Sequence, residues 1–326
     1  MLAALAQIAA APVPPTRLDG FNIVAVPGHP FGSRSASRAM AQAKRLGAGA
    51  LAIVPFLWQA TPASARLDRG SDMSDDDLRN AIRETRKLGM AAVVKPHVWV
   101  PDSWAGTVEP ASEQDWSVWF KAYGEALAHI ARLTAEEKAD ALVVGTELRQ
   151  TSQRPEWADL IGRIRAIYPG LLFYVAHNAD EAERISFWPL LDAIGVSLYP
   201  PLGADHDRDG RLDAMQQSAD RIDALAQRFG KPVIVGEIGL RSAQGAAAKP
   251  WESSEERASA ADPLLQAEVL ADWLRVLDRP AVHGVLIWRW LSDPSAGGLA
   301  DTDFTVQGKP AEGVLLCAWT GSCRKM

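Results

Sequence analysis

The chain has 326 residues, 48% of them hydrophobic and 23% charged, which is enough for one large core or two ordinary ones and excludes a fibrous or disordered composition. A net charge of −6 and dispersed Lys and Arg residues exclude a basic surface for a nucleic-acid backbone, so no nucleic-acid partner is expected. Two cysteines are too few for a thiolate metal cluster.

The N-terminal segment, MLAALAQIAAAPVPP, resembles the end of a secretory signal, although no Lys or Arg precedes Arg17. Its apolar run is too short to span a bilayer, so no membrane partner is expected. We interpret residues 1–18 as a signal-peptide remnant or a disordered leader and residues 19–326 as one catalytic domain. This interpretation predicts a periplasmic or secreted protein, and a cytoplasmic one if the segment is not a signal.

Eight apolar, β-branched runs follow one another along the chain, and segments with helical periodicity separate them. Strands that are buried on both faces lose their polar alternation, so this order predicts a parallel sheet covered on both sides. Eight units in roughly 300 residues, with no G-x-G-x-x-G after the first, favour an α/β fold of the (β/α)8 TIM barrel type. The runs are 21–28, 50–58, 91–100, 141–147, 171–178, 193–200, 232–239 and 284–290.

The segment SDDDLRNAIRETRKLGM illustrates how the predicted helices begin and end. Ser74 and Asp77 fit an N-terminal capping box, and Gly89 fits a left-handed C-cap. Other predicted helices stop in the same way just before the next strand, at Gly47, Gly170 and Gly230.

Polar and aromatic side chains gather at the ends of the predicted strands, where a barrel of this type carries its working residues. Glu147 ends the fourth run and Glu237 the seventh, and a carboxylate beside a buried strand is costly unless something uses it. Cleavage of a glycosidic bond needs two carboxyl groups. The expected catalytic pair is therefore Glu147 and Glu237, and the expected substrate-binding residues are Trp58, Lys95, His97, Trp99, Asn178, Tyr199, Trp288 and Trp290.

The motifs VVGTELRQT and PVIVGEIGLRS, together with KPHVW, closely resemble glycoside hydrolase family 113, the β-mannanase-like members of clan A. The resemblance extends over residues 21–307 and implies a retaining mechanism, with Glu147 as general acid/base and Glu237 as nucleophile. It also implies that Tyr199 hydrogen-bonds the nucleophile and that Trp288 forms the floor beneath the reacting sugar. We therefore expect Glu147 to be held protonated, its pKa raised by apolar surroundings and by the second carboxylate.

One residue departs from the family's pattern. Most clan A enzymes have Asn immediately before the acid/base, where it reaches the sugar's 2-hydroxyl, and this chain has Thr146. The resemblance implies β-1,4-mannan or manno-oligosaccharides as substrates, and we expect a monomer that uses no cofactor. Thr146 leaves open another β-glycan or a cell-envelope polysaccharide, and a catalytically idle carbohydrate-binding barrel is the alternative outside the enzymes.

Several motifs allow other interpretations. The two glutamates could form ion pairs with Arg149 or Arg241, and Lys95 could form a Schiff base, although a charge partner within the barrel is the expectation for it. The aspartates of loop 205–216 have calcium-loop spacing, but Gln216 stands where the bidentate Glu is required, which favours a solvated acidic loop.

Two further sets of residues could bind a metal or form a bond to each other. His177, Asp180 and Glu181 are a poor ligand set, and no catalytic metal is expected. Cys317 and Cys323 could form a small-loop disulfide, which would agree with an oxidising compartment, or remain as two thiols.

Overall fold

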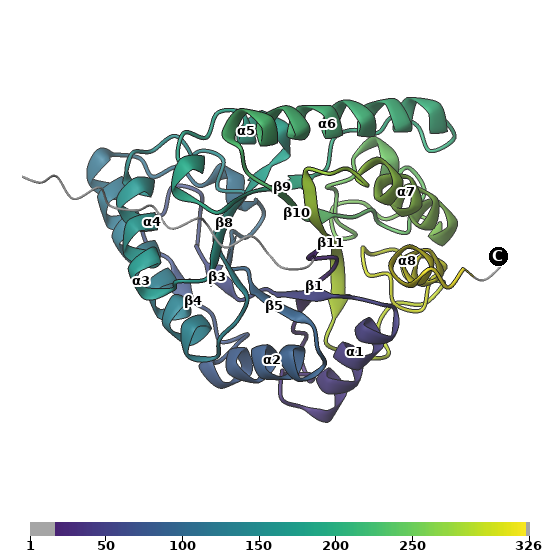
Figure 1. Cartoon of the computed structure of the whole chain (residues 1–326), viewed down its shortest axis with the longest axis horizontal. Coiled ribbons are helices and arrows are strands. Elements are labelled where there is room, and N and C mark those ends of the chain that lie inside the picture. The colour runs from purple at the N-terminus through teal and green to yellow at the C-terminus, as the bar shows by residue number, and fades with distance from the viewer. Residues whose placement is uncertain (1–16, 324–326) are drawn as a thin grey trace, which may run out of the picture.

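The computed structural model describes residues 17–323, so the predicted leader lies outside the described residues except for its last two positions. Eight parallel strands close into a barrel in the order β1-β11-β10-β9-β8-β7-β5-β2, and Figure 1 shows helices arranged around it. The predicted (β/α)8 barrel is confirmed. The barrel strands are β1 (Gly20–Val24), β2 (Ala50–Ile53), β5 (Ala91–Val94), β7 (Ala141–Thr146), β8 (Leu171–His177), β9 (Ala193–Leu198), β10 (Val233–Ile238) and β11 (Val282–Leu291).

Two of the predicted strands, 50–58 and 91–100, are each divided in two. Pro55 and Pro96 lie at the breaks, where proline has no N–H for the barrel's hydrogen-bond ladder. Beyond each proline the chain leaves the barrel and joins a small sheet at its C-terminal end. That sheet contains β3 (Phe56–Trp58), β6 (His97–Trp99) and the antiparallel β4 (Asp68–Arg69).

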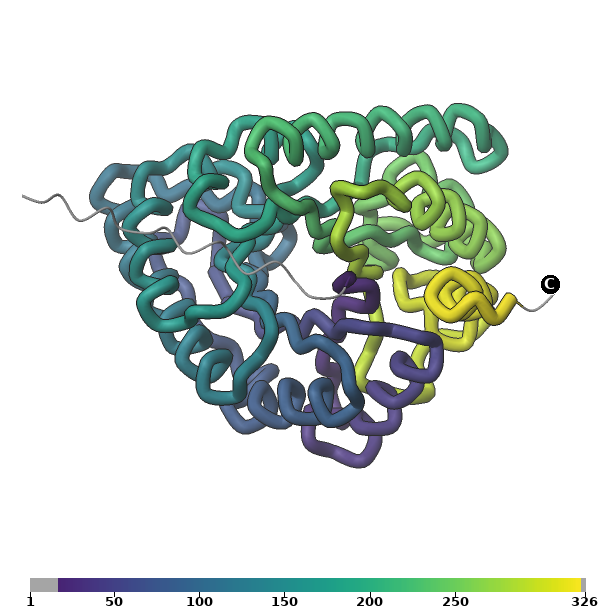
Figure 2. Tube along the Cα trace, in the orientation of Figure 1, coloured from purple at the N-terminus to yellow at the C-terminus, as the bar shows by residue number. Residues whose placement is uncertain are grey.

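Helices surround the barrel, and the colour sequence in Figure 2 follows the chain around the ring until β11 returns beside β1. None of the helices in residues 17–323 is long and apolar enough to cross a membrane. The helices are α1 (Arg34–Arg45), α2 (Asp75–Lys87), α3 (Glu113–Glu136), α4 (Glu156–Ile167), α5 (Asn178–Ala182), α6 (Arg208–Phe229), α7 (Pro263–Val276) and α8 (Ala311–Thr320), with short 3₁₀ turns η1 (Ala105–Thr107), η2 (Trp188–Leu190) and η3 (Ala246–Ala248).

The helix ends follow the capping chemistry of the sequence, with one exception. The capping box of α2 is confirmed, because the Asp77 N–H donates to the Ser74 hydroxyl and the Ser74 N–H donates to the Asp77 carboxylate. Three of the four expected terminal glycines have the left-handed φ that favours glycine: Gly47, Gly89 and Gly230. The prediction for Gly170 is wrong, since α4 ends instead at an extended Tyr168.

Two apolar layers hold the barrel. Small and β-branched residues such as Ala52, Val93 and Val143 fill its interior. A larger cluster lies between strands and helices and includes the buried aromatic residues Trp119 and Trp157. Burial of each such ring removes a large apolar area from water, so the buried half of the twelve tryptophans stabilises the fold rather than facing a ligand.

Candidate active site

Glu147 and Glu237 both lie at the C-terminal end of the barrel. Glu147 directly follows β7 and Glu237 is the penultimate residue of β10, and β8 and β9 separate these two strands in the barrel order. Both side chains are almost fully buried, with residue exposures of 8% and 4%. A buried carboxyl group needs polar partners, and strands β8 and β9 supply several of them.

Each of the two strands is irregular just before its glutamate. The pairing register shifts between Val143 and Thr146 in β7 and between Val235 and Glu237 in β10. Ile234 faces the barrel interior, so strict alternation would send Glu237 outward. The irregularity turns Glu237 into the barrel mouth, which is how bulges re-aim side chains beside functional sites.

Both side-chain hydrogen bonds to Glu147 reach the same carboxyl oxygen, Oε1. His177 Nδ1, at the end of β8, lies 3.1 Å from Glu147 Oε1, and the Ser197 hydroxyl of β9 donates to the same oxygen. The backbone at Glu147 has a φ of +54°, in the left-handed region that a non-glycine residue rarely occupies, and its N–H donates to Val175 O at 2.7 Å. Strain of this kind persists where the surroundings over-determine the conformation, and it clusters at functional sites.

The pKa of Glu147 differs from the expectation of a raised value. Burial alone would raise this pKa, but the charge and hydrogen bond of His177, with smaller contributions from His97 and Ser197, outweigh burial and bring it to about 2. The apolar surroundings and the second carboxylate can be inferred from the sequence. The imidazole meets the Glu147 carboxyl group only in the folded barrel.

Glu237 has a different set of partners. The Lys95 ammonium contacts Glu237 Oε1, and the Tyr199 hydroxyl donates to Oε2 at 3.2 Å. Lys95 is fully buried and its Nζ also lies 5.4 Å from the centre of the Trp288 ring. Burial raises the pKa of Glu237, Lys95 opposes that rise, and the nearby charge of Glu147 adds to it.

The Asn178 side chain links the β8 and β9 ends. Its Oδ1 accepts from the Tyr199 N–H at 2.8 Å, and its Nδ2 lies 3.0 Å from His177 Nε2. Both ends of the amide are therefore engaged within the protein. Asn178 was expected to contact substrate, whereas its side-chain amide contacts the Tyr199 N–H and the His177 ring.

A second ring of hydrogen bonds supports His177 from behind. The His177 N–H donates to Glu181 Oε2 at 2.6 Å, and Tyr174 donates its hydroxyl proton to Glu181 Oε1 at 2.7 Å. The Tyr174 oxygen in turn accepts from the N–H of Leu148, next to Glu147, at 2.8 Å. Burial raises the pKa of Glu181 to about 7.

Thr146, the residue that departs from the family's pattern, is buried beneath Glu147. Its hydroxyl donates to Pro96 O at 3.0 Å. His97 lies nearby: its Nδ1 is 3.1 Å from Val98 O, and burial together with the charge of Lys95 lowers its pKa to about 4. A neutral His97 donates Nδ1–H to that carbonyl and leaves Nε2 as an acceptor.

The expected aromatic binding residues divide into two groups. Trp58 and Trp99, on β3 and β6, expose 39% and 43% of their surface with ring centres 6.0 Å apart, and Trp288 is half-buried beside Lys95. The expectation for Trp290 is wrong, because this residue is completely buried, packs against Phe21 with the rings tilted, and donates its Nε1–H to Ala39 O. Trp288 and Trp290 share a strand but do not share surroundings.

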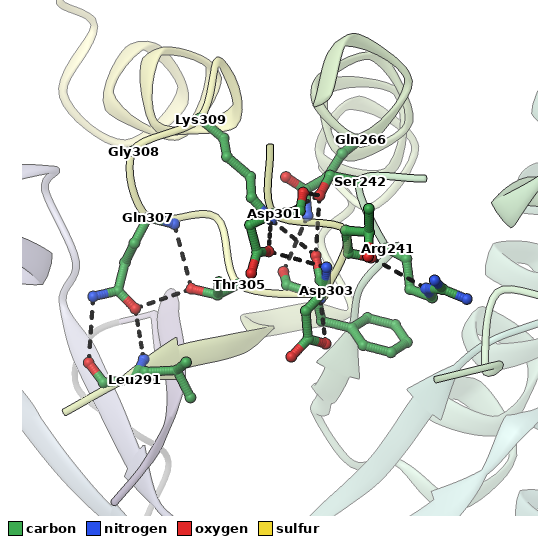
Figure 3. A network of polar contacts seen from close by, with 12 residues as sticks. Arg241, Ser242, Gln266, Leu291, Asp301, Asp303, Thr305, Gln307, Gly308 and Lys309 are labelled. Atoms are coloured by element: carbon green, nitrogen blue, oxygen red, sulfur yellow. Dashed lines mark hydrogen bonds and ion pairs between the residues drawn. The ribbon is translucent and has the colours of Figure 1, made fainter. Parts of the chain in front are cut away.

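The segment after β11 is pinned by the polar network in Figure 3. Lys309 Nζ donates to Ser242 Oγ at 2.7 Å and to Asp301 Oδ1 at 2.6 Å. The Asp303 carboxylate pairs at 2.5 Å with Arg289, the residue that follows Trp288 in the chain. The same segment places Phe304 edge-on against Tyr199, with ring centres 6.4 Å apart. The network thus fixes the rim beside Glu237 and Tyr199.

The alternative interpretations can be compared with the contacts in residues 17–323. Arg241 lies near Glu252 and donates to Ser253 O, so it does not pair with either catalytic candidate. Asp207 caps α6 and Asp205 accepts from the Gly245 and Ala247 N–H groups. Within this part of the chain, no group of three or more His, Cys, Asp or Glu side chains could hold a metal ion.

The two cysteines lie at the end of α8. Cys317 and Cys323 form a disulfide that joins the helix to the segment after it. Of the two possibilities that the sequence left open, a disulfide or two thiols, the structure shows the disulfide.

Three residues beside the glutamates were not among the catalytic and substrate-binding residues expected from the sequence: Ser197, Trp104 and His177. Ser197 lies within a fully buried strand and carried no signal. Trp104 covers His177 with ring centres 4.6 Å apart and comes from the loop before η1. His177 ends a strand, as the other site residues do, and that position was the one available signal.

Comparison with known proteins agrees with the geometry. The sequence model of Glycoside Hydrolase Family 113 matches residues 20–309. The fold is similar to the GH113 β-mannanase AaManA from Alicyclobacillus acidocaldarius, at 23% identity and a TM-score of 0.84 over 94% of this chain and 98% of that one. It is similar to a GH113 β-1,4-mannanase at 25% identity and a TM-score of 0.83 over 94% and 99%.

More distant structures share the barrel. A β-glucuronidase from Ruminococcus gnavus is 13% identical, with a TM-score of 0.62 over 94% of this chain and 50% of that one. A comparison with curated protein sequences gave no match. The match to the family model extends over most of the chain, from β1 to the end of the pinned segment after β11, and includes both glutamate motifs, so the protein belongs to glycoside hydrolase family 113.

Proposed function

We propose that the protein is a retaining hydrolase of β-1,4-mannan or manno-oligosaccharides, with Glu147 as general acid/base and Glu237 as nucleophile. The observation that carries the proposal is the placement of two buried glutamates at the same barrel end, on strands linked by side chains of β8 and β9. Paired carboxyl groups around one glycosidic bond are the machinery of double displacement. The printed names of the similar structures supply the substrate class.

The two steps assign different work to the two carboxyl groups. Glu237 attacks the anomeric carbon while Glu147 gives its proton to the leaving oxygen, which forms a glycosyl ester on Glu237. Glu147, now a carboxylate, then takes a proton from water, and the water oxygen attacks the anomeric carbon and releases Glu237. Lys95 and Tyr199 hold Glu237 in place through both steps.

Aromatic surfaces beside the glutamates support a saccharide as the substrate. The exposed faces of Trp58 and Trp99 and the half-buried Trp288 suit the flat C–H face of a sugar ring. We propose Trp288 as the floor of the site and the other two as more distant contacts. His97 Nε2 is proposed to accept a hydrogen bond from a sugar hydroxyl.

Thr146 supports a second candidate, the hydrolysis of a different β-glycan. Its hydroxyl already donates to Pro96 O, so it cannot also donate to a 2-hydroxyl. At C2, where mannose and glucose differ, Thr146 could only accept a hydrogen bond, so a donor to the 2-hydroxyl must come from another residue. A panel of β-glycans that includes mannan, glucan and cell-envelope polysaccharide distinguishes the two candidates.

The experiment that tests the proposal compares three Glu→Gln variants. Glu237→Gln should lose at least about 10⁴-fold in kcat on every substrate, as removal of a covalent nucleophile does. Glu147→Gln should lose a similar factor on mannan but keep glycosyl-enzyme formation from a dinitrophenyl β-mannoside, whose leaving group needs no proton. Glu125→Gln, on an exposed face of α3, is the matched control.

Product stereochemistry is an independent measurement for the same proposal. Proton NMR of the first product should show the β-anomer before mutarotation. An α-anomer would contradict the retaining mechanism. Unchanged turnover in either catalytic variant would remove that residue from the mechanism, and absence of cleavage across the whole panel would favour a carbohydrate-binding barrel.

We also propose that the protein works as a monomer in an oxidising compartment, periplasmic or extracellular. The Cys317–Cys323 disulfide supports the compartment, because such bonds persist where thiols are not kept reduced. Fractionation of the source cells and size-exclusion chromatography would measure the two claims.

A further inference from the structure

Three hydrogen bonds run in line from the backbone of Tyr199 to the carboxyl group of Glu147. The Tyr199 N–H donates to Asn178 Oδ1 at 2.8 Å, Asn178 Nδ2 lies 3.0 Å from His177 Nε2, and His177 Nδ1 lies 3.1 Å from Glu147 Oε1. The line therefore crosses from the end of β9 to the end of β7.

The first bond fixes the direction of the others. A backbone N–H can only donate, so the atom that faces Tyr199 must be the amide oxygen of Asn178. The amide NH₂ then faces His177 Nε2, and because an amide nitrogen does not accept, Nε2 must be the unprotonated nitrogen of the ring. A neutral imidazole has one N–H, which leaves the proton on Nδ1, donated to Glu147 Oε1.

The two oxygens of Glu147 are consequently unequal. Oε1 receives both the His177 ring N–H and the Ser197 hydroxyl. Among residues 17–323, no side-chain or backbone hydrogen bond reaches Oε2. Two donors on Oε1 lower its basicity, so a proton that Glu147 takes up binds at Oε2.

We propose that Asn178 and His177 are positioning residues for proton transfer: Asn178 holds His177 as the neutral Nδ1–H tautomer, and His177 directs the transferable proton of Glu147 to Oε2. The inference rests on the proposed function only in giving Glu147 the acid/base role. The tautomer itself follows from the hydrogen-bond directions alone.

The charges around His177 explain why a restraint on its protonation is useful. Burial favours a neutral His177, but the carboxylates of Glu147 and Glu181 outweigh burial and Arg149 and raise the pKa of His177 above its usual value. The Asn178 amide opposes that protonation. The charges of His97 and Glu237 also interact with Glu147. An imidazolium would carry Nε2–H toward the Asn178 NH₂, donor against donor, and would keep Glu147 ionised and unable to protonate a leaving group.

The sharpest test is Asn178→Asp, which preserves shape and reverses the restraint. One carboxylate oxygen still accepts from the Tyr199 N–H, while the other accepts from Nε2–H and stabilises the imidazolium. At neutral pH, kcat/KM for a manno-oligosaccharide should fall about 100-fold or more, the share expected of general acid catalysis. Glycosyl-enzyme formation from a dinitrophenyl β-mannoside should change by less than about 5-fold, because that step needs no acid.

The matched control is His177→Asn, since the asparagine Nδ2 occupies the position of the imidazole Nδ1. It keeps a neutral donor to Glu147 Oε1, so the ratio of the two activities should stay within about 10-fold of that of the unaltered protein. Equal losses on both substrates in Asn178→Asp, or no loss on either, would overturn the proposal.

A measurement without substrate separates this proposal from the proposed function. In ¹⁵N-histidine-labelled protein, the His177 ring, assigned by its loss in His177→Asn, should show one protonated and one bare nitrogen at about pH 8. Asn178→Asp should show two protonated nitrogens. Two protonated nitrogens in the unaltered protein would overturn the tautomer assignment, whereas failure to cleave any β-glycan would overturn only the function.

Discussion

Glu147 and Glu237 are both almost fully buried at the C-terminal end of the barrel, but different chemistry holds them. Glu147 faces a titratable imidazole and a hydroxyl, both on one oxygen, and its other oxygen makes no hydrogen bond with the described residues 17–323. Glu237 faces a buried ammonium and a phenol, one on each oxygen. The first arrangement suits a group that exchanges a proton, and the second suits one that stays ionised and fixed.

The two pKa values show how closely the pair is linked. The pKa of Glu147 is lowered by His177, and that of Glu237 is raised by burial and by the charge of Glu147. Uptake of one proton by Glu147 removes the repulsion on Glu237 and leaves Lys95 to favour its carboxylate. The titration of each glutamate therefore depends on the charge of the other.

The largest effect is expected from Lys95→Met, which removes the buried ion pair with Glu237. Removal of one partner of a buried ion pair should lower the free energy of unfolding by about 3–5 kcal/mol and raise the pKa of Glu237. The acidic limb of the kcat/KM profile should then move to higher pH, because a protonated nucleophile is inactive. Denaturant unfolding and pH–rate profiles measure the two effects, with the exposed Lys121→Met as control. An unmoved acidic limb would contradict this role of Lys95.

On the Glu147 side, Glu181→Gln should change the pH dependence of stability. Burial raises the pKa of Glu181 to about 7 from 4.5, so its contribution is complete below about pH 4.5 and is lost as pH rises through about 7. This loss lowers the free energy of unfolding by about 3 kcal/mol. The Glu181→Gln variant should not show this decrease.

Urea unfolding between about pH 5 and 8 measures this slope. Glu183→Gln, on the same turn of chain but half-exposed and paired with Arg221, should keep the slope of the unaltered protein. An identical slope in the Glu181→Gln variant would mean that another group titrates in this range.

The smallest of the three expected effects is the loss of kcat/KM in Tyr199→Phe, which also changes the surroundings of Glu237. Tyr199→Phe removes the 3.2 Å hydrogen bond to Glu237 Oε2 and keeps the ring packing against Phe304. A hydrogen bond to a charged group contributes about 1.5–3 kcal/mol, which corresponds to a roughly 10- to 100-fold lower kcat/KM. Steady-state kinetics with unchanged thermal stability would support this, and a loss below about 2-fold would remove Tyr199 from the site's working residues.

Much of the fold could be read from the sequence, since the underlying physics is local. The eight apolar runs and the capping box of α2 predicted the barrel and its helix boundaries, because strand burial and cap hydrogen bonds act over a few residues. The positions of Glu147 and Glu237 at strand ends were equally visible. Pro55 and Pro96 lie where two of the predicted strands break, and this local signal was not used in the prediction.

Only the closed barrel decided which side chains meet. The partners of Glu147 lie 30 and 50 residues away along the chain, on β8 and β9, and Lys95 reaches Glu237 across 142 residues. A register shift in β10 aims Glu237 inward, and full burial removes Trp290 from the site while its neighbour Trp288 remains at the rim. Strand period and helix caps are short-range properties of a sequence, whereas charge partners, tautomers and pKa values depend on which strand ends the closure of the sheet brings together.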